Sequence, residues 1–568
     1  MQRRRFLRIL RDTRTRSMGA TAVLAGAVML AGCATGTAPQ EQPGAATAGG
    51  RVTILTDTAT QPFDPAKSQS HGVAVFSLVH RRLTSWDVRQ GQPTKAVPDL
   101  ATDTGRPTEN GRTWTYTLKD GLKFADGTPI TAADLKYGIE RSFAPAFAGG
   151  LNYHKTLLAG ADGYQGPFEG KGLDSVQTPD EKTIVFRLNR PYNDWPWVVS
   201  TPAFSPVPKG KGTEPAYSER PIASGPYQVS AYQKGVGITL SRNPFWDKKT
   251  DSVRAALPDE IVFQLGQDTG TVAQRLVADA GEDQRAVGFS LVSPAQLAQL
   301  QGNPAAQQRL VTSPSGALAY LALNTRRGPL ADPKVRKAFQ YAVDKSAFQV
   351  ASAGNARLAG DPASTLIVPG LPGREAFDLY PAPPSGDPEL AKRLLAEAGY
   401  PNGLTGLDFV VGTSGNFPEK AQAVQAGLAR AGIQSTVRTL DSAALKADTT
   451  GAEAKFDLTL DLWQADFPSA NTSIQPLFGS SEVGGGRHNL SRYADPETDR
   501  LIEEAQSVAD PAEAGRKWAA LDQRIMAESP VVPLVYARNS FLRGSKVAGF
   551  FVGEFPAYPS YFQVGIAP

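Results

Sequence analysis

The chain has 568 residues, 41% of them hydrophobic and 20% charged, a composition ordinary for a soluble globular protein with about three or four domain-sized units. Its formal charge of +4 arises at the N-terminus, because seven arginines lie in the first sixteen residues and the remainder holds 52 basic and 54 acidic residues. Nucleic-acid binding needs a basic face, so that class is excluded. One cysteine and four histidines exclude an intramolecular disulfide and argue against a transition-metal site, so we predict no metal and no cofactor.

A basic and then apolar segment opens the chain. Seven arginines lie within residues 3–16, and an apolar run follows over 18–31. This order is typical of a secretory signal, and the apolar run is too short to span a bilayer comfortably. The run ends at Leu30-Ala31-Gly32-Cys33, which resembles the lipobox of bacterial lipoproteins and implies lipid attachment at Cys33. The alternative is a signal-anchor whose cysteine only lies at its end.

The export route stays open between the general secretory route and the twin-arginine route, because residues 3–7 also look like a twin-arginine signal. Residues 34–50 are rich in Ala, Gly, Thr, Pro and Gln and are expected to form a flexible tether. The folded part should begin near Arg51.

Strands and helices alternate after this point. The spacing predicts strands over 52–55, 113–118, 183–188, 260–265 and 433–440, and helices over 73–83 and 418–431. Thr131 and Asp134 form a capping box before a helix whose Leu135, Ile139 and Phe143 share one face. Four more helices should begin at an Asp N-cap followed by Pro, at Asp332, Asp387, Asp495 and Asp510. This alternation indicates an α/β architecture.

Residues 456–469 are the stretch most suggestive of a binding site. Phe456, Leu458, Leu460 and Leu462 alternate with polar residues, which predicts a strand with one buried face. Trp463, Gln464, Asp466 and Pro468 follow directly. A Trp and a carboxylate at the exit of a strand could hold the cationic end of a small ligand; a sheet edge with a helix-capping Asp is the alternative from this stretch alone.

Residues 113–141, which read TWTYTLKDGLKFADGTPITAADLKYGIER, resemble the signature of the family 5 solute-binding proteins, the oligopeptide- and dipeptide-binding components of ABC importers. The resemblance extends along nearly all of the mature chain. Further matches fall in order at 98–101, 205–209, 222–227, 242–246, 323–324, 332–338 and 530–534.

The resemblance implies a fold and its boundaries. The expected fold is α/β and two-lobed, like that of class II periplasmic binding proteins, with an extra domain inserted in lobe I. Lobe I would take residues 51–78, 204–313 and 527–568, the inserted domain 79–203, and lobe II 314–526. The hinge strands would then cross near 313 and 527.

The resemblance also implies the ligand-binding residues. In peptide-binding relatives the Asp of the matching Trp-x-x-Asp segment, here Asp466, pairs with the ligand's α-ammonium group. The adjoining backbone of Leu462 and Gln464 would hold an extended peptide by strand addition, with Trp463 against a side chain. The other implied contacts are Ser70 and His71 from lobe I, Tyr153 from the inserted domain, and Asn416 and Phe417 from lobe II.

The histidines show no metal-ligand spacing. His154 and His71 are placed near the cleft by the resemblance, whereas His80, beside Arg81 and Arg82 on a predicted helix, is expected to be solvated. Residues 78–83 depart from the family pattern, which puts in doubt the transfer of ligand contacts onto 68–83.

We therefore predict a monomeric receptor, not an enzyme, anchored by lipid to the outer face of the cell membrane. It would capture short peptides by lobe closure and deliver them to an ABC permease and its ATPase subunits. Two alternatives stay open. The solute could be an oligosaccharide, an opine or a metal chelate, or the chain could be a secreted hydrolase using Asp461 and Asp466, although a strand places residues five apart on opposite faces.

Overall fold

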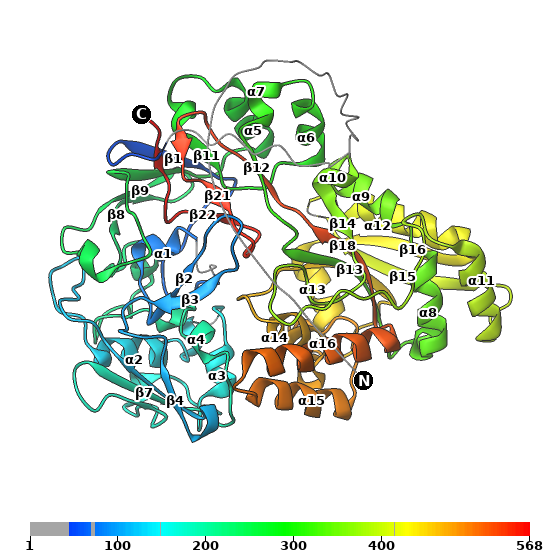
Figure 1. Cartoon of the computed structure of the whole chain (residues 1–568), viewed down its shortest axis with the longest axis horizontal. Helices are drawn as coiled ribbons and strands as arrows, with labels where there is room; N and C mark the ends of the chain where they lie inside the picture. Colours follow the sequence, from blue (N-terminus) through cyan, green and yellow to red (C-terminus); the bar gives the residue numbers. More distant parts are fainter. Residues whose placement is uncertain (1–44, 70–73, 148, 414) are drawn as a thin grey trace, which may run out of the picture. The chain divides into compact units, whose positions relative to one another are not determined.

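The computed structural model describes residues 45–69, 74–147, 149–413 and 415–568 (Figure 1). Cys33, the signal segment, Ser70 and His71 lie outside the described residues. Three large sheets organise the described chain.

The first sheet has five strands, and with the helices that follow it we call this part lobe I. Strand β1 pairs in parallel with both of its neighbours, and the other pairs are antiparallel. In spatial order the strands are β11 (Ala286–Gly288), β1 (Arg51–Leu55), β10 (Glu260–Gln264), β9 (Gly237–Arg242) and β8 (Tyr227–Gln233). Helices α5 (Thr269–Ala278), α6 (Pro294–Leu300) and α7 (Pro304–Gln307) lie between β10 and the exit from the lobe.

The second sheet is antiparallel and belongs to what we call the inserted domain. Its strands, in spatial order, are β4 (Arg106–Thr108), β5 (Thr113–Thr117), β7 (Thr183–Arg187) and β6 (Val176–Gln177). A two-stranded ribbon of β2 (Thr84–Asp87) and β3 (Lys95–Pro98) precedes it. The helices are α2 (Ala132–Arg141), α3 (Tyr153–Leu157) and α4 (Trp195–Val198). The capping box predicted before α2 is confirmed, and Leu135, Ile139 and Phe143 are buried.

The third sheet has six strands and forms the centre of lobe II. In spatial order they are β14 (Gly360–Pro362), β18 (Val531–Ala537), β13 (Ala317–Leu323), β17 (Leu458–Trp463), β15 (Leu404–Gly412) and β16 (Ile433–Leu440). The helices are α8 (Pro333–Ala342), α9 (Lys345–Ala353), α10 (Ala356–Ala359), α11 (Pro388–Glu397), α12 (Phe417–Arg430), α13 (Ser442–Thr450), α14 (Asn471–Phe478), α15 (Pro496–Ser507) and α16 (Pro511–Glu528). In Figure 1, α8, α11 and α12 are drawn around this sheet, and their apolar faces share one buried cluster with it.

The four Asp-Pro helix starts are confirmed. Asp332, Asp387, Asp495 and Asp510 are the N-caps of α8, α11, α15 and α16, and each side chain accepts a backbone N–H of its helix. An Asp at this position satisfies an otherwise unpaired donor, and Pro fits the first turn because its missing N–H is not needed there.

Two segments connect lobe I with lobe II, and they lie side by side. Strands β12 (Leu310–Thr312) and β19 (Ser540–Leu542) pair antiparallel, and Ser313 N–H donates to Asn539 O over 2.8 Å. Strand β18 is hydrogen-bonded between β14 and β13 of the third sheet and runs to Ala537. The predicted domain boundaries and crossing points stay predictions.

The region around His80 differs from its prediction. The helix α1 spans only Phe76–Val79, and His80 is fully buried, with its Nε2 2.9 Å from Phe63 O. Burial lowers the pKa of His80 to about 3, so the ring is neutral rather than solvated. Apolar residues on both sides of the short helix draw the whole segment into the core, a tertiary effect that local spacing does not report.

Candidate functional site

β17 is an interior strand of the six-stranded sheet, which sets the position of the site. It pairs with β13 on one side and β15 on the other. Leu458 and Leu460 are buried as predicted, but Thr459 is buried as well, because helices and loops cover both faces of an interior strand. Leu462, predicted on the buried face, is instead 37% exposed at the end of the strand. The chain leaves the sheet here and carries the Trp-x-x-Asp segment out of it.

Asp466 meets the inserted domain. The Tyr153 hydroxyl, on α3, donates to Asp466 Oδ2 over 2.5 Å, although the two residues are 313 positions apart. Burial raises the pKa of Asp466, and the Tyr153 bond and the nearby His488 oppose that shift. Burial and then Asp466 raise the pKa of Tyr153 well above its usual value, so this hydroxyl stays a donor. Within the described chain, no ion pair neutralises this half-buried carboxylate.

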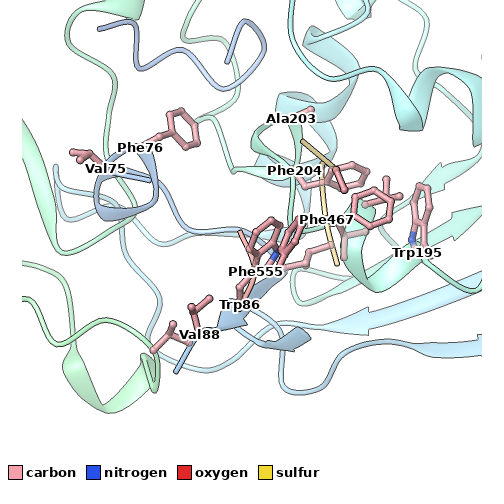
Figure 2. Packing of buried hydrophobic residues seen from close by; sticks show 14 of the residues in the cluster. Val75, Phe76, Trp86, Val88, Trp195, Ala203, Phe204, Phe467 and Phe555 are labelled. Atoms are coloured by element: carbon pink, nitrogen blue, oxygen red, sulfur yellow. The ribbon is translucent and has the colours of Figure 1, made fainter. Parts of the chain in front are cut away.

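The residue after Asp466 fixes its loop by apolar packing. The ring of Phe467 is fully buried, and its centroid lies 5.2 Å from that of Tyr153. Phe467 belongs to the same buried cluster as Phe204, at the end of the inserted domain, and Phe555 of the C-terminal segment (Figure 2). The carboxylate is therefore held at a contact between parts of the molecule rather than on a free loop.

Trp463 and Gln464 occupy different environments. Trp463 is half-buried, its Nε1–H donates to Thr472 O over 2.7 Å, and its ring centroid lies 5.0 Å from that of His488. The Gln464 side-chain amide is buried at both polar atoms, and neither has a hydrogen-bond partner among the described residues. A buried amide without a partner is costly, so Gln464 offers a donor and an acceptor to an incoming polar group.

The contacts of Asn416 and Phe417 keep them within lobe II. Asn416 Nδ2 donates to Ala351 O over 2.7 Å and Phe417 packs against the lobe II core. Among the described contacts, none joins either residue to Asp466. Asn416 and Phe417 lie at the start of α12, and their role as ligand contacts stays a prediction.

Asp461, the partner of Asp466 in the hydrolase alternative, has its own tyrosine. Tyr320 on β13 donates to Asp461 Oδ2 over 3.0 Å, and Leu462 N–H donates to Oδ1 over 2.9 Å. Burial raises the pKa of Asp461. The two carboxylates are thus engaged separately, which gives no support to an acid–base pair.

His154 is a core residue of the inserted domain. It is 1% exposed, its Nε2 lies 2.7 Å from Ser142 Oγ, and its ring contacts Phe143 and Phe204. Burial lowers the pKa of His154 to about 3.

Sequence reasoning missed several polar residues of this region, namely Tyr192, Asp194, Ser469, Asn471 and His488. Ser469 lies in the same loop as Asp466, and Asn471 begins α14 directly after it, so both could have been considered with Asp466. Tyr192 and Asp194 come from a distant segment with no motif of their own. Only tertiary contact reveals them.

Neither a metal site nor a membrane span emerges from the described residues. No group of three or more His, Cys, Asp or Glu among them is placed to hold an ion. None of the helices described combines the length and apolar character that crossing a bilayer requires.

The chain was compared with known proteins. A family model described as bacterial extracellular solute-binding proteins, family 5 middle, matches residues 95–485. Glutathione-binding protein GsiB of Escherichia coli K12 is 27% identical over 454 residues, which is 78% of this chain and 81% of GsiB.

Solved structures are similar as well. Clavulanic acid biosynthesis oligopeptide binding protein 2 is 32% identical with a TM-score of 0.85, covering 93% of this chain and 97% of that one. The Helicobacter pylori protein DppA, solved with the peptide STSA, has a TM-score of 0.71 at 21% identity, over 92% of this chain and 99% of its own, and supports the fold. The fold is the two-lobed α/β arrangement of periplasmic binding proteins, with an extra domain in lobe I.

Proposed function

Because this chain belongs to family 5 of the bacterial extracellular solute-binding proteins, the receptors of ABC importers, we propose that its solute is a short peptide with a free α-ammonium group. Members of this family are transport receptors rather than enzymes and act outside the cytoplasm. The finer question is therefore which solute binds, and where.

The observation that carries the proposal is the environment of Asp466. Its carboxylate is half-buried, receives one hydrogen bond from the neutral Tyr153 hydroxyl and, within the described chain, has no Lys or Arg partner, with only His488 nearby to lower its pKa. A ligand ammonium would supply the missing charge in a charge-assisted hydrogen bond, which contributes about 1.5–3 kcal/mol. Gln464 would then satisfy its amide on the ligand backbone.

The names of two relatives agree with this chemistry. One is named for oligopeptide binding and the other for binding glutathione, and both solutes carry a free α-ammonium group. Ligand bridging of Asp466 and the inserted domain would favour the closed state by its higher affinity for that state.

Calorimetry with matched peptides tests the proposal. A short peptide with a free N-terminus should bind at least about tenfold more tightly than its N-acetylated form, because acetylation removes the charge that Asp466 attracts. Equal affinities would reject the assignment of Asp466. Native mass spectrometry of the purified protein would identify a carried-over solute; a sugar, opine or metal chelate there would replace the peptide.

We further propose a lipid anchor at Cys33, supported by the lipobox-like residues 30–33. Two or three acyl chains would retain the protein at the membrane. In the native bacterium the Cys33→Ser protein should move from the membrane fraction to the medium or periplasm. If it stays in the membrane fraction, the anchor lies elsewhere.

A further inference from the structure

The inserted domain and lobe II meet at a second set of contacts, beside Asp466 but separate from it. On the inserted domain the contacts come from the segment that precedes α4. On lobe II they come from the loop after Asp466, from the start of α14 and from α15. We call this set the polar junction; it consists of Tyr192, Asn193, Asp194, Ser469, Asn471 and Gln506.

Four hydrogen bonds build the polar junction. Asn471 Nδ2 donates to Tyr192 Oη over 2.6 Å, and Gln506 Nε2 donates to Asn471 Oδ1 over 3.0 Å. The backbone N–H of Asn193 donates to Gln506 O over 3.1 Å. Beside them, Ser469 Oγ donates to Asp194 Oδ2 over 2.6 Å.

Most side chains of the polar junction are buried, and those of Asn193 and Asp194 are half-buried. Tyr192, Asn471 and Gln506 are buried to the same degree as core residues. Buried polar groups are stable only when they are paired, and here three of the four bonds join different parts of the chain. On separation each group could bind water instead. The polar groups are therefore hydrogen-bonded in both states, to one another when the two parts are in contact and to water when they separate.

The only crossings between lobe I and lobe II in the described chain are the paired segments at Ser313 and Asn539. A hinge motion there would move lobe II relative to the inserted domain, which is covalently part of lobe I. Such a motion must break the polar junction. We infer that the polar junction is a closure latch, which holds the inserted domain against lobe II without any solute.

The stability of the latched state depends on pH through the carboxyl group of Asp194. Burial raises the pKa of Asp194 to about 6, against the hydrogen bonds from Ser469 and Asn471. Two further charged groups influence the pKa of the neighbouring Tyr192. They are Arg190, on the same segment, and Asp466 from lobe II.

The sign of this dependence follows from linkage. A carboxyl group in water titrates near 3.9, so the latched state binds this proton more tightly than the open state. Closure is therefore favoured in full below about pH 4 and loses this contribution as the pH rises through about 6. The dependence does not rely on which solute the protein carries.

Single-molecule energy transfer on the solute-free protein measures the latch directly. Dyes on Lys234→Cys of lobe I and Glu397→Cys of lobe II, both exposed, would report the closed-to-open ratio in a Cys33→Ser background. Tyr192→Phe and Asn471→Ala should each lower this ratio about threefold, since each removes the hydrogen bond between Asn471 and Tyr192 that joins the two parts.

Two matched controls sharpen the test. Tyr227→Phe removes a buried hydroxyl that bonds only within lobe I, to Pro258 O, and should leave the ratio unchanged. Asp194→Asn keeps an acceptor for Ser469 but cannot ionise, so it should abolish the pH dependence and raise the closed fraction at pH 7.5. Asp174→Asn, an exposed change in the same domain, should do neither.

The outcomes separate cleanly. An unchanged ratio in both Tyr192→Phe and Asn471→Ala would overturn the latch, as would a solute-free protein that is entirely open at pH 5. Because no solute is added, a failure of the peptide assignment leaves these measurements unaffected.

Discussion

Two carboxylates in this molecule, the buried Asp99 and the half-buried Asp466, have opposite electrostatic environments. In lobe I and the ribbon before the inserted domain, Asp99 lies between Arg81 and Arg254, at 2.8 Å from each. Burial alone would raise the pKa of Asp99, but Arg254 and Arg81 outweigh burial and lower it. Asp466 has no such partner, and burial raises its pKa. The charge of Asp99 is neutralised by the chain itself, whereas that of Asp466 is left for something else.

The difference distinguishes a buried charge that serves the fold, that of Asp99, from the charge of Asp466, which we propose serves binding. Breaking a buried ion pair leaves an unpaired charge and costs about 3–5 kcal/mol. A carboxylate without a cationic partner has no such pair to lose. Each variant below tests one of these two environments.

The largest expected effect is on stability. Arg254→Ala should lower the free energy of unfolding by about 3–5 kcal/mol, because Arg254 also pairs with Asp251 at 3.0 Å and donates to Ser77 O. Thermal or denaturant unfolding measures this. Arg438→Ala, which removes an exposed pairing with Asp408 and Asp448, is the control and should cost about 1 kcal/mol or less. Equal losses would show that burial does not distinguish the two networks.

The next effect is on affinity alone. Asp466→Ala should weaken binding of a free-amine peptide about tenfold or more and leave the unfolding free energy nearly unchanged. Calorimetry and denaturant unfolding measure the two quantities. Asp461→Asn, which removes a charge held by Tyr320, is the matched control and should change the affinity much less. If both variants weaken binding equally, the site is a diffuse negative field rather than one carboxylate.

A pH series tests the raised pKa of Asp466. Peptide affinity should fall as the pH drops. Because the pKa of Asp466 is raised, the fall should begin at a higher pH than it would for an ordinary Asp, whose pKa is about 3.9. The reason is that only the ionised carboxylate attracts the ammonium group. The series belongs in the Asp194→Asn background, where the latch no longer titrates. An affinity that stays constant down to about pH 4 would contradict the shift.

The smallest effect concerns the hydroxyl that touches Asp466. Tyr153→Phe removes the one hydrogen bond that joins this carboxylate to the inserted domain and should weaken peptide binding about threefold, in line with the net contribution of a single hydrogen bond. Tyr164→Phe, whose hydroxyl donates to Lys171 O at an exposed position, should bind normally. A stronger affinity in Tyr153→Phe would mean that the hydroxyl competes with the ligand instead of supporting it.

Much of the fold was predictable from local sequence patterns. The capping box of α2, the four Asp-Pro helix starts and the strand β5 depend on neighbours within a few residues, so the sequence alone indicated them. The prediction for His80 was wrong, because its burial depends on Phe63 and on the core around α1. Leu462 departed from its alternation because the strand ends there.

The site was predictable only where a resemblance linked distant segments. Tyr153 and Asp466 were placed opposite one another in this way, and the structure brings them into contact. The polar junction had no such guide: an Asn, a Gln and a Ser on helices and loops carry no signal until they are folded against Tyr192 and Asp194.

The pairing of Ser313 with Asn539 has one more consequence. The 225 or so residues between them leave and rejoin the chain at the same place, so they form an uninterrupted stretch of polypeptide with its own sheet and its own apolar interior. Because its two ends are already adjacent, this stretch could be produced by itself to test whether it folds alone. Nascent chains could complete this half during synthesis, before the last thirty residues return to finish the other.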